Sequence, residues 1–277
     1  MSKIIIFSLT VLFFSSIFFS LFQKENQSEI TKEFMEEEIK EKISITTVYD
    51  NYKTDPSLKT GWGFSCLIKM SGENILFDTG ADSETLLSNM ERMGIDLTEI
   101  NTTVLSHIHG DHIGGLEGIL ERNGNVKVYI PGSFPSSMRE MISSYGGESI
   151  DITEPFQIAE GVYSTGELGD WIKEQSLIIN SERGLVIITG CAHPGIVNII
   201  QKAKQLFPEK EVFLVLGGFH LSSFSDFQLQ DIIQDFRELR VQKAAPCHCS
   251  GDRCRQLFKQ EYKENFIENG VGKVIEI

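Results

Sequence analysis

Short apolar runs alternate with polar, glycine-containing loops along most of the chain. Residues 103–105, 184–189 and 211–216 are almost wholly apolar, and each run leads into a loop that holds glycine and histidine. A short apolar run bounded by turn residues predicts a buried strand. A stretch with helical periodicity then follows each loop. This succession of strand, loop and helix predicts an α/β fold.

The same pattern predicts the individual elements. It predicts strands over residues 43–49, 64–70, 74–77, 102–105, 126–130, 175–179, 184–189, 211–216, 241–245 and 273–277, and a strand or hairpin over 156–165. It predicts helices over residues 83–93, 114–121, 135–145, 196–206 and 227–239, and one that begins near Asp252. Asp82 or Ser83 should cap the helix over 83–93, and Gly94 should end it.

The beginning of the chain has a different character. Residues 4–22 are apolar apart from Ser and Thr, and lie between Lys3 and Lys24. About 20 apolar residues can span a bilayer, and a charged start before an apolar core also resembles a secretory signal. We therefore expect residues 1–22 to be a membrane anchor or a signal peptide, so that the protein is membrane-anchored or exported. Residues 23–42 are rich in Glu and predict a polar spacer, and residues 43–277 form the predicted domain.

The candidate chemistry is concentrated in residues 106–112, a loop that holds three of the six histidines and an aspartate. In an extended loop, residues two apart point the same way, so His107 and His109 can bind one metal ion. Asp111 and His112 point elsewhere and can reach a second ion. Imidazole and carboxylate ligands suit zinc, iron or manganese. The alternative is a solvated loop with chance histidines, which the rarity of histidine disfavours.

The remaining histidines repeat this placement. His193, His220 and His248 each lie on a loop after a predicted strand, as the first three do. Chance does not place all six histidines so, and we take this as the strongest argument for a shared metal site. His193 can add the ligand that a tetrahedral site still needs. Its alternative role is to cap the helix that follows.

Composition narrows the class of partner. The net charge is −14 and Lys and Arg form no cluster, which argues against a nucleic-acid surface. We therefore expect a small-molecule substrate and no nucleic acid; the sequence leaves the oligomeric state open. The five cysteines are an odd number without the spacing of a disulfide framework. A bond between Cys249 and Cys254 stays an alternative for an exported domain.

Taken together, these motifs resemble the metallo-β-lactamase superfamily. The residues that carry the resemblance are the stretches 77–80, 106–112, 190–195, 217–221 and 246–251, which read FDTG, SHIHGDH, GCAHPG, GGFHL and PCHCSG. They are most similar to the branch described as 7,8-dihydropterin-6-methyl-4-(β-D-ribofuranosyl)-aminobenzene-5′-phosphate synthase-like metal-dependent hydrolases. The resemblance implies an αββα sandwich over residues 43–277, built from two mixed sheets with helices on the outer faces. It also implies that Asp78 braces the metal loop by hydrogen bonds.

The resemblance implies one or two metal ions, with zinc expected first and iron or manganese as alternatives. We assign His107, His109 and His193 to one ion. We assign Asp111, His112 and His248 to the other. Many members of the superfamily carry an aspartate that bridges two metals, and the chain has none at the corresponding places. Cys191 or His220 is nearest to that position, and whether either is a ligand stays open.

The function that this reading predicts is metal-dependent hydrolysis. A metal-activated water attacks an ester, a lactone or a phosphoester. Asp111 orients the water and accepts its proton, and His220 faces the substrate. One alternative is a pterin-type transferase or synthase that uses the same metals. Another is a non-catalytic metal-binding domain at a membrane.

Overall fold

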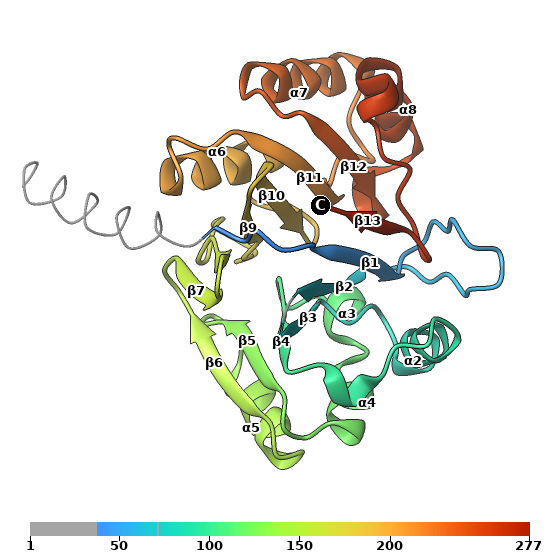
Figure 1. The fold of residues 1–277 in the computed structure, drawn as a ribbon, viewed down its shortest axis with the longest axis vertical. Coiled ribbons are helices and arrows are strands. Elements are labelled where there is room, and N and C mark those ends of the chain that lie inside the picture. The colour runs from blue at the N-terminus through green and yellow to red at the C-terminus, as the bar shows by residue number, and fades with distance from the viewer. Residues whose placement is uncertain (1–37, 71) are drawn as a thin grey trace, which may run out of the picture.

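Two mixed β-sheets lie face to face in the computed structural model, which describes residues 38–70 and 72–277. One apolar cluster contains buried side chains from both sheets and fills the space between them. A second apolar cluster lies between one sheet and the helices that cover it, and a third lies between the other sheet and its helices. The layers therefore run helix, sheet, sheet, helix (Figure 1), and the predicted αββα sandwich is confirmed.

The first sheet has seven strands in the order β13-β1-β2-β3-β4-β5-β6. They are β1 (Ser44–Tyr49), β2 (Ser65–Met70), β3 (Glu73–Phe77), β4 (Thr102–Val104), β5 (Lys127–Pro131), β6 (Glu148–Ile152) and β13 (Val274–Glu276). The strands from β3 to β6 run parallel, and the others pair antiparallel. The sequence pattern missed β6, because this edge strand is half exposed and has only two apolar residues.

The second sheet has six strands in the order β12-β11-β10-β9-β8-β7. They are β7 (Phe156–Ala159), β8 (Val162–Ser164), β9 (Leu177–Ser181), β10 (Gly184–Thr189), β11 (Val212–Gly218) and β12 (Lys243–Cys247). β10, β11 and β12 are parallel, whereas β7 to β10 form an antiparallel meander. All of these strands fall within or beside the ranges that the apolar runs predicted.

The central strands are apolar along their whole length because both of their faces are buried. In β10, Leu185 and Ile187 pack in the cluster beneath the helices, and Val186 and Ile188 pack between the two sheets. Successive side chains of a strand point to opposite faces. A strand covered on both faces therefore reads as a continuous apolar run, which is how the sequence identified β10.

The described part of the chain also contains seven α-helices and three short 3-10 helices, which are η1 (Leu97–Glu99), η2 (His248–Ser250) and η3 (Lys263–Asn265). The α-helices are α2 (Ser83–Arg92), α3 (Gly110–Ile113), α4 (Leu116–Arg122), α5 (Ser136–Ser144), α6 (Ile196–Leu206), α7 (Asp226–Glu238) and α8 (Asp252–Tyr262). The predicted cap of α2 is Asp82, whose carboxylate accepts a hydrogen bond from the Thr85 amide at 2.7 Å. Gly94 has the left-handed φ of +67° that suits the residue after a helix.

The loop after β4 departs from the extended conformation that we expected up to His112. The chain becomes helical at Gly110, and α3 ends before two glycines that separate it from α4. A Cβ on Gly114 would lie 2.0 Å from the Ala81 carbonyl oxygen, and one on Gly115 would lie 2.2 Å from that of Thr79. The two glycines therefore let the loop pack directly against the chain that follows β3.

Residues 38–42 contact the folded domain, although we expected them to belong to the spacer. The Ile39 amide donates to the Asn180 carbonyl at 2.9 Å, and Glu38 pairs with Lys210. The folded part of the chain therefore begins before the expected boundary at Ile43. The predicted anchor or signal over residues 1–22 lies outside the described residues, as does most of the spacer. Among the described residues, no helix is long and apolar enough to cross a membrane.

The carboxyl ends of the parallel strands bring the histidine loops together. Parallel strands end at the same edge of their sheet, so the loops after β3 and β4 meet, as do those after β10, β11 and β12. The two sets also touch each other across the sandwich. The Gln175 amide donates to the Ser106 carbonyl at 2.9 Å, and a Cβ on Gly190 would lie 2.1 Å from the Ser106 Oγ.

This close approach yields a prediction for two glycines of the site loops. Gly190→Ala should destabilise the metal-free protein by about 1–3 kcal/mol, because the added methyl overpacks a buried contact. Gly110→Ala is the matched control: no atom lies within 4 Å of its Cβ position, and stability should stay the same or rise slightly. Chemical denaturation measures both variants. Equal stability of the Gly190→Ala and Gly110→Ala variants would show that the contact between the two sets of loops does not depend on Gly190.

Candidate metal centre

Four loops bring all six histidines to one place. The loop after β4 supplies His107, His109 and His112, and the loops after β10, β11 and β12 supply His193, His220 and His248. Their donor atoms form three groups, in each of which all donor atoms lie within 4.8 Å of one another. The groups are His107, His109 and His193; Asp111, His112, Cys191 and His248; and Cys191, His193 and His220.

The three-histidine group is partly open to solvent. His107 is buried, whereas His109 and His193 are half-buried. The His107 Nε2 lies 3.1 Å from the His109 Nδ1, and the His193 ring centroid is 4.6 Å from that of His107. Burial lowers the pKa of His107 to about 3, so its imidazole is neutral at physiological pH. A neutral imidazole has the free lone pair that a metal ligand needs.

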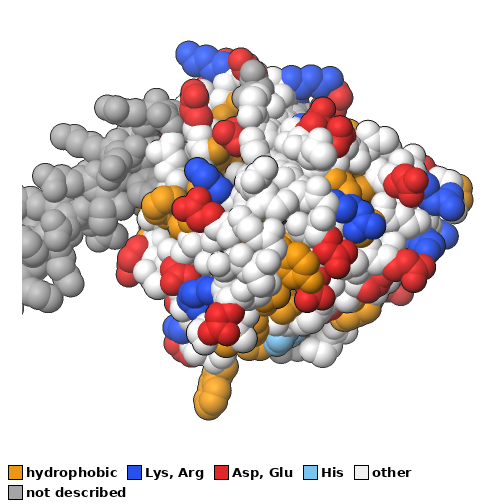
Figure 2. All heavy atoms as spheres, turned by 90° about the horizontal axis from the view of Figure 1, so that it is seen from below, with side chains coloured by type: hydrophobic (Ala, Val, Ile, Leu, Met, Phe, Trp, Pro, Cys, Tyr) orange, Lys and Arg blue, Asp and Glu red, His pale blue; other side chains and the backbone are white. Residues whose placement is uncertain are grey.

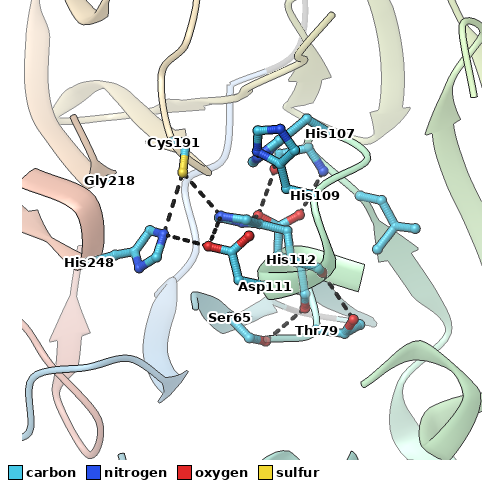
Figure 3. Close-up of polar contacts among 12 residues, drawn as sticks. Ser65, Thr79, His107, His109, Asp111, His112, Cys191, Gly218 and His248 are labelled. Carbon is cyan, nitrogen blue, oxygen red and sulfur yellow. Dashed lines mark hydrogen bonds and ion pairs between the residues drawn. The ribbon is translucent and has the colours of Figure 1, made fainter. Parts of the chain in front are cut away.

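The four-residue group is more buried, since three of its four members are buried. Figure 3 shows its side chains. The Cys191 Sγ is 3.2 Å from the His112 Nε2 and 3.4 Å from the His248 Nε2. An Asp111 carboxylate oxygen is 3.7 Å from the His112 Nε2 and 3.4 Å from the His248 Nε2. Burial also lowers the pKa of His112 to about 3. Four donor atoms of three chemical kinds therefore face one another.

Four of these histidines are held from behind in the same way. Each makes a hydrogen bond through its Nδ1 atom. His107 bonds to the Ser106 Oγ at 2.8 Å, and His112 bonds to an Asp78 carboxylate oxygen at 2.6 Å. His193 bonds to a Glu174 carboxylate oxygen at 2.8 Å, and His248 bonds to the Asn51 Oδ1 at 3.1 Å. An acceptor at Nδ1 selects the tautomer with its proton there. The Nε2 lone pair is then free to bind a metal, an arrangement typical of metal-ligating histidines.

Asp78 braces the metal loop, as the resemblance implied. Its buried carboxylate accepts hydrogen bonds from the Ser106 amide at 2.6 Å and the Ser106 hydroxyl at 2.7 Å, in addition to the His112 ring. Burial raises the pKa of Asp78 to about 7, against the opposing effects of electrostatic interaction with His107 and of the Ser106 hydrogen bonds. The predicted bracing contact is therefore confirmed.

Glu174 is a site residue that the sequence did not reveal. Its buried carboxylate accepts hydrogen bonds from the amides of Cys191, Ala192 and His193 at 2.7–3.0 Å, and from the His193 ring. Burial by itself would raise the pKa of Glu174, but the hydrogen bond from His193 and neighbouring charge lower it to about 2. Its sequence signal is a charged residue directly before a predicted strand of apolar residues, which is weak.

Asn51 and Trp62 were also missed, because both lie in the long polar loop between β1 and β2. Asn51 accepts from the His248 ring and also donates to the His248 carbonyl at 3.4 Å. The Trp62 ring lies 4.9 Å from the His248 ring and is 58% exposed. This loop therefore reaches the metal centre from the other end of the chain, with an indole face directed at solvent.

The two predicted catalytic residues differ in exposure and charge. Burial would raise the pKa of Asp111, but a hydrogen bond with His248 and electrostatic interaction with His112 and His248 hold this pKa well below its ordinary value. Asp111 is therefore ionised, which suits a metal ligand better than a proton acceptor. His220 is the exposed histidine of the six, and its ring lies 4.5 Å from that of His193. A hydrogen bond with Cys249 raises the pKa of His220, against the effect of burial.

The backbone of the site is strained. Asp78, Ala192, His220 and His248 all have φ between +48° and +62°, a left-handed conformation that residues with a Cβ rarely adopt. Such residues cost about 1–3 kcal/mol each and persist where the surrounding structure fixes them. Among the described residues only two other non-glycine positions, Arg240 and Lys263, share this conformation. Strain is thus concentrated at the loops that carry the donors.

Comparison with known proteins agrees with this geometry. The sequence profile of the metallo-beta-lactamase superfamily matches residues 63–201, half of the chain. The chain belongs to the metallo-beta-lactamase superfamily. The matched range includes the loop after β4 and the Gly190–Gly195 turn, and therefore all three residues of the three-histidine group.

Two relatives and one solved structure are similar over most of the chain. A Methanocaldococcus jannaschii protein named 7,8-dihydropterin-6-methyl-4-(beta-D-ribofuranosyl)-aminobenzene-5'-phosphate synthase is 28% identical, over 82% of this chain and 93% of its own. The uncharacterized protein MJ0448 of the same organism is 32% identical, over 78% of this chain and 93% of its own. The crystal structure of Tm1679, a metal-dependent hydrolase of the beta-lactamase superfamily, is 26% identical with a TM-score of 0.72, over 85% of this chain and 99% of its own.

The metallo-beta-lactamase fold implies that a divalent metal binds at this place, and the donors here fit one. They are imidazoles, an ionised carboxylate and a thiol, and in each group the donor atoms lie within 4.8 Å of one another. The structure brings together all six predicted ligands in the two groups that we assigned, and adds Cys191 to the second. Their roles as ligands stay predictions, and so do the catalytic roles of Asp111 and His220. The five cysteines are free, so the Cys249–Cys254 disulfide is absent.

The buried hydrogen bonds of Glu174 lead to a prediction about metal affinity. Glu174→Gln should weaken metal binding about 10–100-fold, because His193 loses the anionic acceptor that orients its ring. The metal-free protein should lose about 1–3 kcal/mol of stability, since the buried amides lose part of their acceptor. Metal titration and denaturation measure the two effects. Glu182→Gln, on an exposed residue, is the control, and equal metal affinity of both variants would refute the positioning role.

Proposed function

We propose that the protein is a metal-dependent hydrolase that acts on a small ester, lactone or phosphoester. The observation that carries the proposal is the set of four histidines that are fixed through Nδ1 and turn their Nε2 atoms toward one another, beside an ionised carboxylate. A divalent metal bound there would lower the pKa of a water molecule toward neutral pH and polarise the bond to be cleaved.

We propose zinc as the metal. Zinc takes imidazole, thiolate and carboxylate ligands together, usually four of them in tetrahedral geometry. Iron and manganese also accept imidazole and carboxylate, but a thiol among the donors favours zinc. Iron and manganese are therefore the alternatives to be tested by elemental analysis.

The chain's own residues have distinct parts in this proposal. Asp111 stays ionised, so it can bind a cation and accept a hydrogen bond from the attacking water. Its low pKa makes it a weaker proton acceptor than we expected from the sequence. His220 is the exposed histidine and lies beside His193. It is thus the residue we assign to contact the substrate.

The surface supports a small molecule as the substrate. Acidic and basic side chains are interspersed over the face in Figure 2, where Lys and Arg do not gather into a patch. With a net charge of −14, the protein offers little attraction to a polyanion such as a nucleic acid. A phosphoester small enough to reach the metal centre stays within the proposal.

A second candidate is transfer between two substrates on the same metal centre. It is favoured by the name of the 28% identical relative, which is a pterin-type synthase. Product analysis with and without a nucleophilic acceptor separates the two functions, because a hydrolase needs only water. A third candidate, a non-catalytic metal-binding domain, predicts bound metal without turnover.

Metal content and turnover provide the first test. Protein purified without chelator and supplied with metal should hold one or two transition-metal ions per chain. It should hydrolyse at least one member of a panel of esters, lactones and phosphodiesters. Chelation should abolish this activity, and zinc should restore it. Protein that holds no metal under these conditions would contradict the proposal.

Asp111 provides the second test. Asp111→Asn keeps the shape of the side chain but removes its charge, so the metal of the four-residue group should be lost while that of the three-histidine group stays. Turnover should fall by about 10²-fold or more, because the attacking water loses the carboxylate that orients it. Elemental analysis and kinetics measure both effects. Asp231→Asn, on an exposed helical residue, is the control, and wild-type turnover by Asp111→Asn would refute the assigned role.

A further inference from the structure

We propose that Cys191 is a thiolate ligand that closes the metal site of Asp111, His112 and His248. This inference rests on the proposed metal-dependent function and adds to it. It makes the two sites unequal: one with three protein donors and one with four. The superfamily profile and the relatives' names say nothing of a thiol at this position.

The first support is the spacing of the four donor atoms. Zinc bonds of about 2.0–2.2 Å to nitrogen and oxygen and about 2.3 Å to sulfur place the ligands of a tetrahedron about 3.3–3.6 Å apart. The His112 Nε2 and the His248 Nε2 lie 3.2 Å and 3.4 Å from the Cys191 Sγ. They lie 3.7 Å and 3.4 Å from an Asp111 oxygen. Two of these four distances lie within that range and the other two lie 0.1 Å outside it, so four edges are close to the dimensions of the tetrahedron.

The second support is how firmly Cys191 is held. Its amide donates to the Glu174 carboxylate at 3.0 Å, as do the amides of the next two residues. The side chain is buried and directed between the two imidazoles (Figure 3). Asp78 and Asn51 meet the two rings at Nδ1, so both Nε2 atoms face the sulfur. A cation between the sulfur and the two nitrogens would be bound by all three.

A neighbouring thiol provides the matched comparison. Cys249 is also buried, and its Sγ lies 3.6 Å from the Cys191 carbonyl oxygen. It belongs to none of the donor groups among the described residues. Cys249 makes a hydrogen bond with His220 and does not face His112 and His248, so the geometry makes only Cys191 a ligand of that site.

The consequence is a division between the two sites. A site with four protein ligands is closed, as structural zinc sites are, whereas a site with three leaves a position for water or substrate. The closed site is buried, and the open one is half-exposed. Its thiolate should also make the closed site the more selective for zinc. The three-histidine site is then where exchange with solvent takes place.

The experiment is spectroscopic and uses the full chain loaded with metal. X-ray absorption of the zinc-loaded wild type should show a sulfur neighbour at about 2.3 Å. The cobalt(II)-loaded wild type should show a thiolate-to-cobalt charge-transfer band in the near ultraviolet. Cys191→Ser should lose this band, and Cys249→Ser should keep it. A chelator should remove one metal equivalent quickly, and the equivalent that stays should be the one with the band.

The outcomes separate this inference from the proposed function. Two bound metals without a sulfur neighbour in the wild type would overturn the inference and leave the hydrolase proposal standing. Loss of the band in Cys249→Ser but not in Cys191→Ser would also overturn it. Protein that binds no metal would overturn both. The wild-type measurement needs no variant, so the inference stays testable if Cys191→Ser does not fold.

Discussion

The hydrogen bond that four of the histidines make through Nδ1 is the interaction on which the site depends. Burial favours the neutral form of an imidazole. An acceptor behind the ring then fixes which nitrogen faces the metal site. The four acceptors come from the ends of β3 and β4, from the loop before β9 and from the loop after β1. No single stretch of chain could provide them, so the site exists only when the sandwich is complete.

The residues that hold the histidines also include most of the unfavourable features of the structure. Asp78, Ala192, His220 and His248 have left-handed backbones, and Asp78 and Glu174 are buried carboxylates. Each of these features is unfavourable by itself. Three apolar clusters, one between the sheets and one under each helical layer, offset them. The rigid strands then hold the loops in conformations that the loops would not adopt alone.

The metal centre has a buried side and a side that is open to solvent. Cys191, His112 and His248 are buried, while His109 and His193 are half-buried and His220 is exposed. In the proposed function, a substrate that comes from solvent would therefore meet the three-histidine side first. On the inner side, the half-buried Asp111 keeps a negative charge beside the neutral His112. A divalent cation is the natural partner for that charge, since a carboxylate that is partly withdrawn from solvent needs compensation.

The sequence by itself determined the elements, the fold class and most of the donors. Continuous apolar runs identified β10 and β11 because both faces of these strands are buried. The six histidines were identifiable because each follows such a run. The sequence missed the edge strand β6 because its apolar pattern is weak. It missed the helical turn α3 because the packing of Gly114 against Ala81 decides the conformation there.

Only the tertiary structure decided how the donors are grouped and what holds them. Glu174 lies 19 residues before His193, and Asn51 lies 197 residues before His248. Neither side chain has a local pattern that marks it. The position of Cys191 between two imidazoles likewise depends on three loops that meet in space. A local sequence pattern records which face of a strand or helix is buried, but hydrogen bonds between loops depend on how the two sheets pack, and that is fixed only when the whole chain folds.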